Sequence, residues 1–148
     1  MPERAPLKDS PMHTDFVNPS DLCPTFGWTH VATVSGGTTV YISGQVSVDE
    51  HGKVVGAGDL GAQTRQSFEN VTRALAAVGA TWENVVKTNL YVVGLKPQHV
   101  PLIREVRSRF VSAEHPPVST LVGVSALVGP EWLIEIEAVA VIPEDSVA

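Results

Sequence analysis

The sequence predicts an α+β fold, in which a single six-stranded sheet has two helices packed on one face. Three observations lead to this prediction. About six short segments are rich in β-branched residues, as strands are. Two longer segments repeat apolar residues every three or four positions, as helices on a core do. The order is three strands, a helix, a strand, a helix and two strands, and short connections favour both helices on one face.

Length and composition indicate one globular domain. A chain of 148 residues that is 43% hydrophobic and 18% charged can bury a core without disulfide bonds. Its formal net charge is −6 and no run of Lys or Arg occurs. This charge balance argues against a nucleic acid or an anionic membrane surface as a partner.

Cysteine usage and the absence of long apolar runs favour the cytoplasm. Cys23 is the single cysteine, so no disulfide can form within the chain. No apolar run approaches the ~20 residues that span a bilayer, and the first residues lack the apolar segment of a signal peptide. We therefore expect a cytoplasmic protein.

Residues 1–24 differ from the rest of the chain in their proline content. Five of the eleven prolines fall in this segment. We expect it to be an extended or partly disordered N-terminal arm, followed by a single domain over residues 25–148. Met12 is a second candidate for the start of the chain.

The first strands are expected over residues 29–34 and 39–48. Gly36 and Gly37 between them predict a hairpin. Gly44 interrupts the second strand after Ser43. A glycine within a strand marks either a bulge or a place where another group approaches the backbone closely, and the sequence leaves both alternatives open.

Two helices are expected over residues 60–80 and 97–112, on either side of a strand at residues 85–93. Asp59 can cap the first helix and Gly79 can end it. The apolar stripe of the first helix is formed by Phe68, Val71, Leu75 and Val78, and that of the second by Val100, Ile103, Val106 and Phe110. Arg104, Arg107 and Arg109 are predicted to lie on the solvated surface of the second helix, where some of them could pair with carboxylates.

Residues 117–142 are expected to form two strands joined by a tight turn at Gly129-Pro130. Residues two apart in a strand share a face. Glu135 and Glu137 therefore point to one face, whereas Ile134 and Ile136 point to the core. The face opposite the helices also carries Val, Leu, Thr and Tyr residues, and we expect it to be buried by self-association.

Four segments resemble, in matching order, the RidA/YjgF/UK114 (reactive intermediate deaminase) family. They are YISGQ at 41–45, QTRQSFENV at 63–71, VVKTNLYV at 85–92 and IEIEAVA at 134–140. The resemblance covers residues 28–142. It implies a chorismate-mutase-like fold and a homotrimer with ligand clefts between neighbouring subunits. Well-known members hydrolyse reactive enamines and imines, which releases ammonia and a 2-oxo acid.

The chain departs from the pattern of the active imine deaminases, which implies a subgroup without the substrate-binding arginine. That arginine stands two residues after the proline that corresponds to Pro117, where this chain has Ser119. A hydroxyl can hydrogen-bond a carboxylate but cannot neutralise it. Trp28 replaces a cleft tyrosine, and Ile103 replaces an asparagine. We therefore expect 2-imino acids to be poor substrates.

The resemblance assigns the candidate site. Glu135 matches the glutamate that orients or activates water, although it could instead cap backbone amides or pair with an arginine at a subunit boundary. Glu137 is expected to be structural. The expected substrate-binding residues are Ser119, Thr120, Ser43, Gly44, Trp28 and Leu121. The histidines lack metal-ligand spacing and no phosphate-binding loop occurs, so we expect neither a metal nor a cofactor.

Two functions follow from this comparison. The first is a RidA-like hydrolase or deaminase that acts on an enamine, an imine or a related metabolite in clefts between subunits. The alternative is a non-catalytic trimer that binds a metabolite or acts as a regulator or chaperone. Ribonuclease activity has also been attached to the family, but the acidic charge balance argues against it here.

Overall fold

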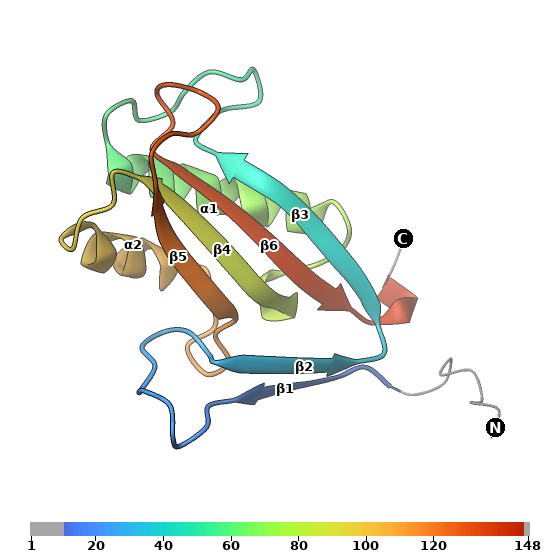
Figure 1. Cartoon of the computed structure of the whole chain (residues 1–148). Coiled ribbons are helices and arrows are strands. Elements are labelled where there is room, and N and C mark those ends of the chain that lie inside the picture. The colour runs from blue at the N-terminus through green and yellow to red at the C-terminus, as the bar shows by residue number, and fades with distance from the viewer. Residues whose placement is uncertain (1–10, 147–148) are drawn as a thin grey trace, which may run out of the picture.

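The computed structural model describes residues 11–146, which form two helices on one side of a mixed sheet (Figure 1). The two helices are α1 (Leu60–Ala76) and α2 (His99–Arg107). The strands are β1 (His13–Val17), β2 (Val31–Ser35), β3 (Thr38–Val46), β4 (Val85–Val93), β5 (Val118–Val124) and β6 (Ile134–Ile142). Short 3-10 turns lie at Trp82–Asn84 and Glu144–Ser146. The predicted α+β class with both helices on one face is confirmed.

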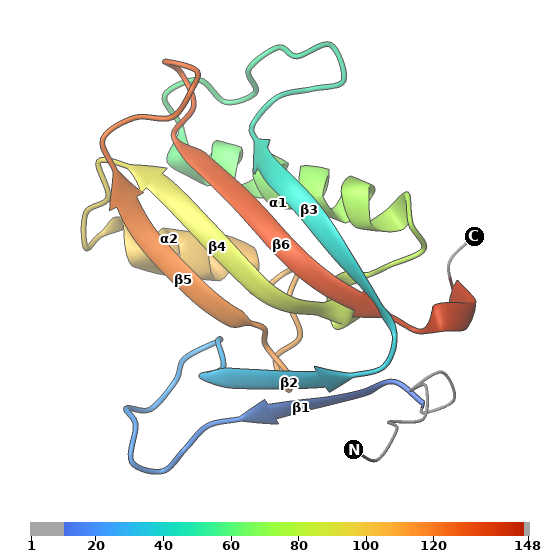
Figure 2. The same cartoon turned by 45° about the vertical axis from the view of Figure 1, so that its right-hand side comes forward.

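The prediction of one six-stranded sheet is wrong. The described strands form a two-stranded sheet, β1-β2, and a four-stranded sheet in the order β3-β6-β4-β5. Gly36 and Gly37 do not form a hairpin but turn the chain from one sheet into the other (Figure 2). Both have a positive φ, and a Cβ on Gly37 would lie 2.7 Å from the carbonyl oxygen of Ile142. The corner is therefore packed against the end of β6.

The prediction that β5 and β6 are joined by a tight turn is also wrong. β5 pairs parallel to β4, whereas β6 lies between β3 and β4 and is antiparallel to both. Residues 125–133 therefore cross over the end of β4. Gln63 of α1 holds this connection, because its Oε1 accepts from the Leu133 amide at 2.9 Å and its Nε2 donates to the Glu131 carbonyl at 2.9 Å.

The core lies between the helices and the four-stranded sheet. Phe68 and Val71 of α1 pack there with Ile134 and Ile136 of β6, and all four side chains are fully buried. The predicted inward direction of the two isoleucines is confirmed by the alternating burial of β6. Glu135 and Glu137 consequently point to the face of the sheet that no helix covers.

The first helix begins as predicted and ends four residues earlier. Asp59 accepts a hydrogen bond from the Ala62 amide at 3.0 Å. At the other end, Gly79 has φ 73° and the Ala80 amide donates to the Leu75 carbonyl at 3.0 Å. This is the geometry in which a glycine ends a helix. Val78, predicted on the apolar stripe, is consequently exposed.

The second helix is shorter than predicted, since the regular α-helical hydrogen bonding ends at Arg107. Phe110 follows in a turn and still stacks on Phe68, with ring centroids 5.1 Å apart. Part of the predicted N-terminal arm, His13–Val17, forms β1 and pairs with β2. Residues 1–10 lie outside the described part of the chain. No helix within residues 11–146 is long and apolar enough to cross a bilayer.

Candidate functional site

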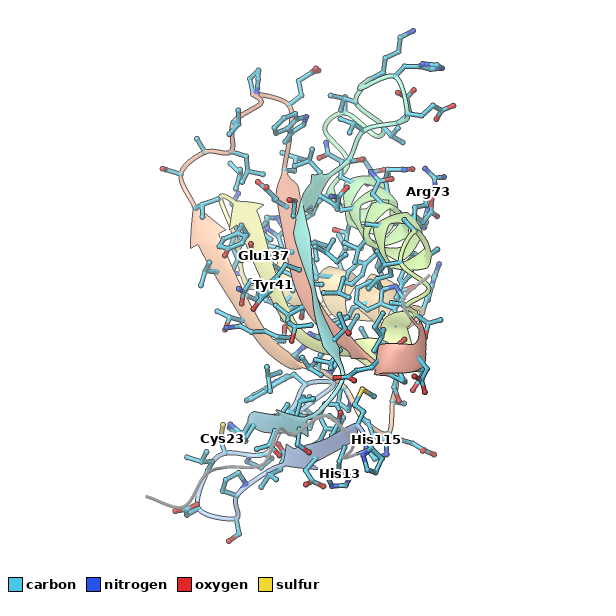
Figure 3. The ribbon with its side chains drawn as sticks, turned by 90° about the vertical axis from the view of Figure 1, so that its right-hand side faces the viewer. His13, Cys23, Tyr41, Arg73, His115 and Glu137 are labelled. Carbon is cyan, nitrogen blue, oxygen red and sulfur yellow. The ribbon has the colours of Figure 1, made fainter. Side chains whose placement is uncertain are left out.

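The uncovered face of the four-stranded sheet mixes polar and apolar side chains. Tyr41 of β3 is 80% exposed and Val122 of β5 is 39% exposed, whereas Glu137 lies half-buried between them on β6. Figure 3 shows Tyr41 and Glu137 near one another, on the side of the sheet away from α1. A carboxylate thus lies in the middle of a surface that exposes large side chains, Tyr41 and Val122, on its two edge strands.

Glu137 accepts two hydrogen bonds from β4. The Tyr91 hydroxyl donates to its Oε1 at 2.6 Å, and the Asn89 Nδ2 donates to the same oxygen at 2.9 Å. Asn89 lies directly opposite Glu137 in the antiparallel register. The Tyr91 hydrogen bond, followed by that of Asn89, lowers the pKa of Glu137, and the same hydrogen bond raises the pKa of Tyr91.

A hollow of about 350 Å³ lies over this group. It is lined by Tyr41, Ile42, Ser43, Lys87, Asn89, Glu137, Ala138 and Val139. Ser43, an expected substrate-binding residue, therefore lines the same hollow as Glu137. The Lys87 ammonium is exposed on the rim and also favours the ionised form of Glu137. The hollow is large enough for a small metabolite and is polar at its floor.

Gly44 brings β3 and Glu135 into close contact. The register of β3 against β6 shifts between Ile42 and Gln45, so that Ser43 and Gly44 form a bulge. A Cβ on Gly44 would collide with the Glu135 Oε1 and would lie 2.7 Å from its Cδ. Gly44 therefore lies in a bulge, as one alternative predicts, and the Glu135 carboxylate of the same chain stands where a side chain would otherwise lie. Contact of Gly44 with a ligand stays a prediction.

Three of the expected substrate-binding residues lie on the helix-facing side, in a second hollow of about 200 Å³. This hollow is lined by Trp28, Leu90, Val100, Ile103, Arg104, Arg107, Ser119 and Leu121. Ser119 lies opposite Thr88 in the parallel register and accepts a hydrogen bond from its hydroxyl at 3.1 Å. Thr120 points to the uncovered face, because alternate residues of a strand point to opposite faces.

Within one chain, most of the expected site residues therefore lie in two separate groups. Ser43, Gly44 and Glu135 lie at the β3-β6 side of the sheet. Trp28, Ser119 and Leu121 lie together at the edge formed by β5 and α2. Strands β6 and β4 separate the two sheet edges, β3 and β5.

The prediction that Arg107 is solvated is wrong, since its side chain is buried with 8% exposure. Its Nη2 donates to the Phe26 carbonyl at 3.3 Å, and a Cβ on Gly27 would lie 2.7 Å from that nitrogen. Burial lowers the pKa of Arg107, and the charge of Arg104 contributes in the same direction. Helical periodicity did not reveal this burial, because the covering segment lies some 80 residues earlier in the chain.

Asn89 and Tyr91 were not among the site residues predicted from the sequence. Their two-residue spacing within a predicted strand is the signal that could have placed them opposite Glu137 and Glu135. Within residues 11–146, no group of three His, Cys, Asp or Glu side chains could hold a metal ion.

Two helices over one face of a mixed sheet, with paired glutamates on the other face, define a small α+β protein of the RidA type. The family model described as Endoribonuclease L-PSP matches residues 21–142. The chain belongs to this family, the RidA/YjgF/UK114 family.

Two relatives illustrate the similarity in sequence. The chain is 32% identical over 109 residues to 2-iminobutanoate/2-iminopropanoate deaminase of Dermatophagoides farinae, a match that covers 74% of this chain and 82% of the relative. It is also 32% identical over 107 residues to a RutC family protein of Pyrococcus horikoshii, with 72% and 82% covered.

Solved structures show the same fold. The chain superposes with a TM-score of 0.83 on YyfB of Yersinia pestis, a Rid family protein of unknown function, at 37% identity over 87% of this chain and 98% of the other. The RidA protein of an Antarctic Psychrobacter gives a TM-score of 0.64 at 27% identity, with 86% and 98% covered.

Proposed function

We propose that the protein is a RidA-type hydrolase that releases ammonia from a small enamine or imine metabolite, with Glu135 acting on the attacking water. The observation that carries this proposal is the space that the Ser43-Gly44 bulge gives to the Glu135 carboxylate. The relative named as an imine deaminase supports the same class of reaction. We further propose that the chain represents a subgroup in which Ser119 stands in place of a substrate-binding arginine.

The reaction requires one group that takes a proton from water and later returns it. The water oxygen adds to the imine carbon while Glu135 accepts a water proton, and the C=N electron pair moves to nitrogen, which takes up a proton. The C–N bond of this intermediate then breaks as its hydroxyl loses a proton, and ammonia leaves. The net change is imine plus water to carbonyl compound plus ammonia.

We propose that the site is completed by a second copy of the chain, as in the homotrimer that the family resemblance implies. This proposal is supported by the division of the expected residues between two sheet edges. In a head-to-tail ring, the β3 edge of one copy faces the β5 edge of the next. Glu135 and Gly44 of one copy would then meet Trp28 and Ser119 of its neighbour.

An ammonia-release assay on enzymatically generated imines tests the assignment of Glu135. We expect Glu135→Gln to reduce the rate to that of buffer, because the amide cannot accept the proton. Glu83→Gln, at an exposed carboxylate in the turn before β4, is the matched control and should keep the wild-type rate. Unchanged turnover in Glu135→Gln would remove this residue from the mechanism.

A trimer that binds a metabolite without converting it is the second candidate. It is favoured by the neutral hydroxyl of Ser119, which already accepts a hydrogen bond from Thr88. A thermal-shift screen of small metabolites separates the two functions. Stabilisation by a ligand that is recovered unchanged supports the binding protein, whereas accumulation of a carbonyl product supports the hydrolase.

A further inference from the structure

The hollow on the uncovered face of the sheet contains a carboxylate that the chain itself pairs at one oxygen only. Both donors from β4, the Tyr91 hydroxyl and the Asn89 amide, reach Oε1 of Glu137. Within residues 11–146 the second oxygen, Oε2, accepts no hydrogen bond, and Glu137 forms no ion pair. An ionised carboxylate offers about four acceptor positions. The structural role expected of Glu137 therefore leaves one oxygen available to a ligand.

The same two hydrogen bonds fix this carboxylate in position and in charge. Asn89 lies directly opposite Glu137 in the β4-β6 register, and Tyr91 reaches it diagonally. Two charge-assisted hydrogen bonds from a paired strand leave the side chain little freedom. The Tyr91 hydrogen bond, followed by that of Asn89, also lowers the pKa of Glu137, so that it is ionised at neutral pH. A half-buried negative charge is thus held in the hollow.

A positive charge lies at the rim of the same hollow. Lys87 comes two residues before Asn89 on β4, and its side chain is exposed. In the part of the chain that the structure describes, no carboxylate forms an ion pair with it. Its charge favours the ionised form of Glu137, but the two groups do not touch. Two opposite charges therefore face one hollow with space between them.

Apolar groups and a hydroxyl complete the lining of the hollow. Tyr41 of β3 and Val139 of β6 lie opposite each other in the register, and both line it. The Tyr41 ring is 80% exposed and lies near Glu137 (Figure 3). Ser43 contributes a hydroxyl. The volume of about 350 Å³ falls within the range of about 300–1,000 Å³ that is typical of small-molecule sites.

These features favour a zwitterion over an ion of either sign. A simple cation would pair with Glu137 but be repelled by Lys87, and a simple anion would meet the reverse. An α-amino acid carries both charges on one carbon atom, and an apolar side chain on that carbon can pack against Tyr41 and Val139.

We propose that this hollow binds an apolar α-amino acid, with its ammonium group on Glu137 and its carboxylate on Lys87. The inference goes beyond the proposed function, because it assigns a ligand to two charged residues that the proposed reaction does not use. Glu135, on which that reaction depends, does not line the hollow. The proposal therefore concerns a second site, and its test requires no turnover.

Calorimetric titration of the full-length protein with L-valine tests the proposal against two probes of similar size. L-valinamide keeps the ammonium group only, and 3-methylbutanoate keeps the carboxylate only. We expect L-valine to bind at least about tenfold more tightly than 3-methylbutanoate, which loses the contact with the half-buried Glu137. The preference over L-valinamide should be smaller, about threefold, because Lys87 is exposed and solvent screens its charge.

Two results in the wild-type protein would overturn the proposal. One is equal affinity for L-valine and 3-methylbutanoate, since Glu137 would then make no contact with the ligand. The other is the absence of saturable binding of L-valine, which is the result expected if another copy of the chain fills the hollow.

Variants assign each charge to its residue. Glu137→Gln keeps an acceptor for Tyr91 and should weaken the binding of L-valine at least about tenfold. Lys87→Met should weaken it about threefold and abolish the preference over L-valinamide. Lys53→Met, at an exposed lysine in the loop between β3 and α1, is the matched control and should bind as the wild type does. Wild-type affinity in a folded Glu137→Gln protein would contradict the assignment, and the comparison of probes in the wild type decides the question if this variant does not fold.

A last variant separates this hollow from the proposed catalytic cleft. Glu135→Gln should bind L-valine with wild-type affinity, because Glu135 lies outside the lining of the hollow. Loss of L-valine binding in a folded Glu135→Gln protein would place the ligand in the catalytic cleft and contradict the inference. The release of ammonia is not measured in these titrations, so failure of the proposed function and failure of this inference are distinguished.

Discussion

Substitution of Gly44 by alanine tests the contact between the β3 bulge and Glu135. Gly44 is not among the glycines with positive φ, so its backbone accepts alanine without strain. The added Cβ would meet three atoms of one side chain, namely Oε1, Cδ at 2.7 Å and Cγ at 2.9 Å of Glu135. Glu135 must therefore rotate away from the bulge.

The expected loss in the free energy of unfolding depends on which atoms collide. Overpacking costs about 1–3 kcal/mol, and forcing a side chain off its rotamer costs about 0.5–1.5 kcal/mol. Since the colliding atoms belong to a rotatable side chain, we expect Gly44→Ala to lower the free energy of unfolding by about 1–2 kcal/mol. In a Glu135→Ala background all three atoms are absent, and the cost should fall close to zero.

Chemical denaturation of the four proteins of this double-mutant cycle, followed by circular dichroism, measures the coupling. We expect a coupling free energy of about 1–2 kcal/mol. Gly123→Ala is the control, because its Cβ would meet Leu95 at 3.0 Å and not Glu135, so that its effect should be the same in both backgrounds. An equal cost of Gly44→Ala in both backgrounds would refute the reasoning.

Three further predictions concern other contacts. Tyr91→Phe should lower the free energy of unfolding by about 1–2 kcal/mol, because it removes a hydrogen bond to a charged acceptor, and thermal denaturation at neutral pH would show it. The pKa of Glu137 is lowered in the folded state, so its carboxylate stabilises the fold above the unfolded pKa of about 4.3, and this stabilisation is lost as pH falls through the folded pKa. Denaturation between about pH 6 and pH 2 should therefore show a loss of stability that Glu137→Gln reduces, and identical pH profiles would contradict the assignment. Gln63→Ala should cost about 2–4 kcal/mol, because it leaves the Leu133 amide and the Gly56 and Glu131 carbonyls without their partner, and a cost under about 0.5 kcal/mol would show that water replaces the amide.

Local patterns in the sequence predicted the elements and the directions of their side chains. In β6, the alternation of side chains places Glu135 and Glu137 on one face and Ile134 and Ile136 on the other. This alternation depends only on the strand itself and not on the strands that pair with it. The end of α1 near Gly79 could also be predicted from nearby residues, because it depends on one glycine and the preceding helical turn.

Features that depend on distant partners could not be predicted. Gly36-Gly37 permits either a hairpin or a corner, and the packing of Gly37 against Ile142 decides between them. The burial of Arg107 depends on Phe26 and Gly27, which precede it by some 80 residues. The division of the site follows from the insertion of β6 between β3 and β4, which strand periodicity does not encode.

Complementation between two variants, each of which we expect to release no ammonia by itself, tests most directly the claim that Glu135 works in a cleft shared by two copies. Glu135→Gln and Trp28→Ala chains are unfolded together, refolded in equal amounts and assayed for ammonia release. If Glu135 and Trp28 of one site come from different copies, random assembly leaves about a quarter of the sites intact, and about that fraction of the wild-type rate should return. If both residues come from the same copy, no mixed site is intact. A refolded mixture without activity, beside a refolded wild-type control that is active, would contradict the shared cleft.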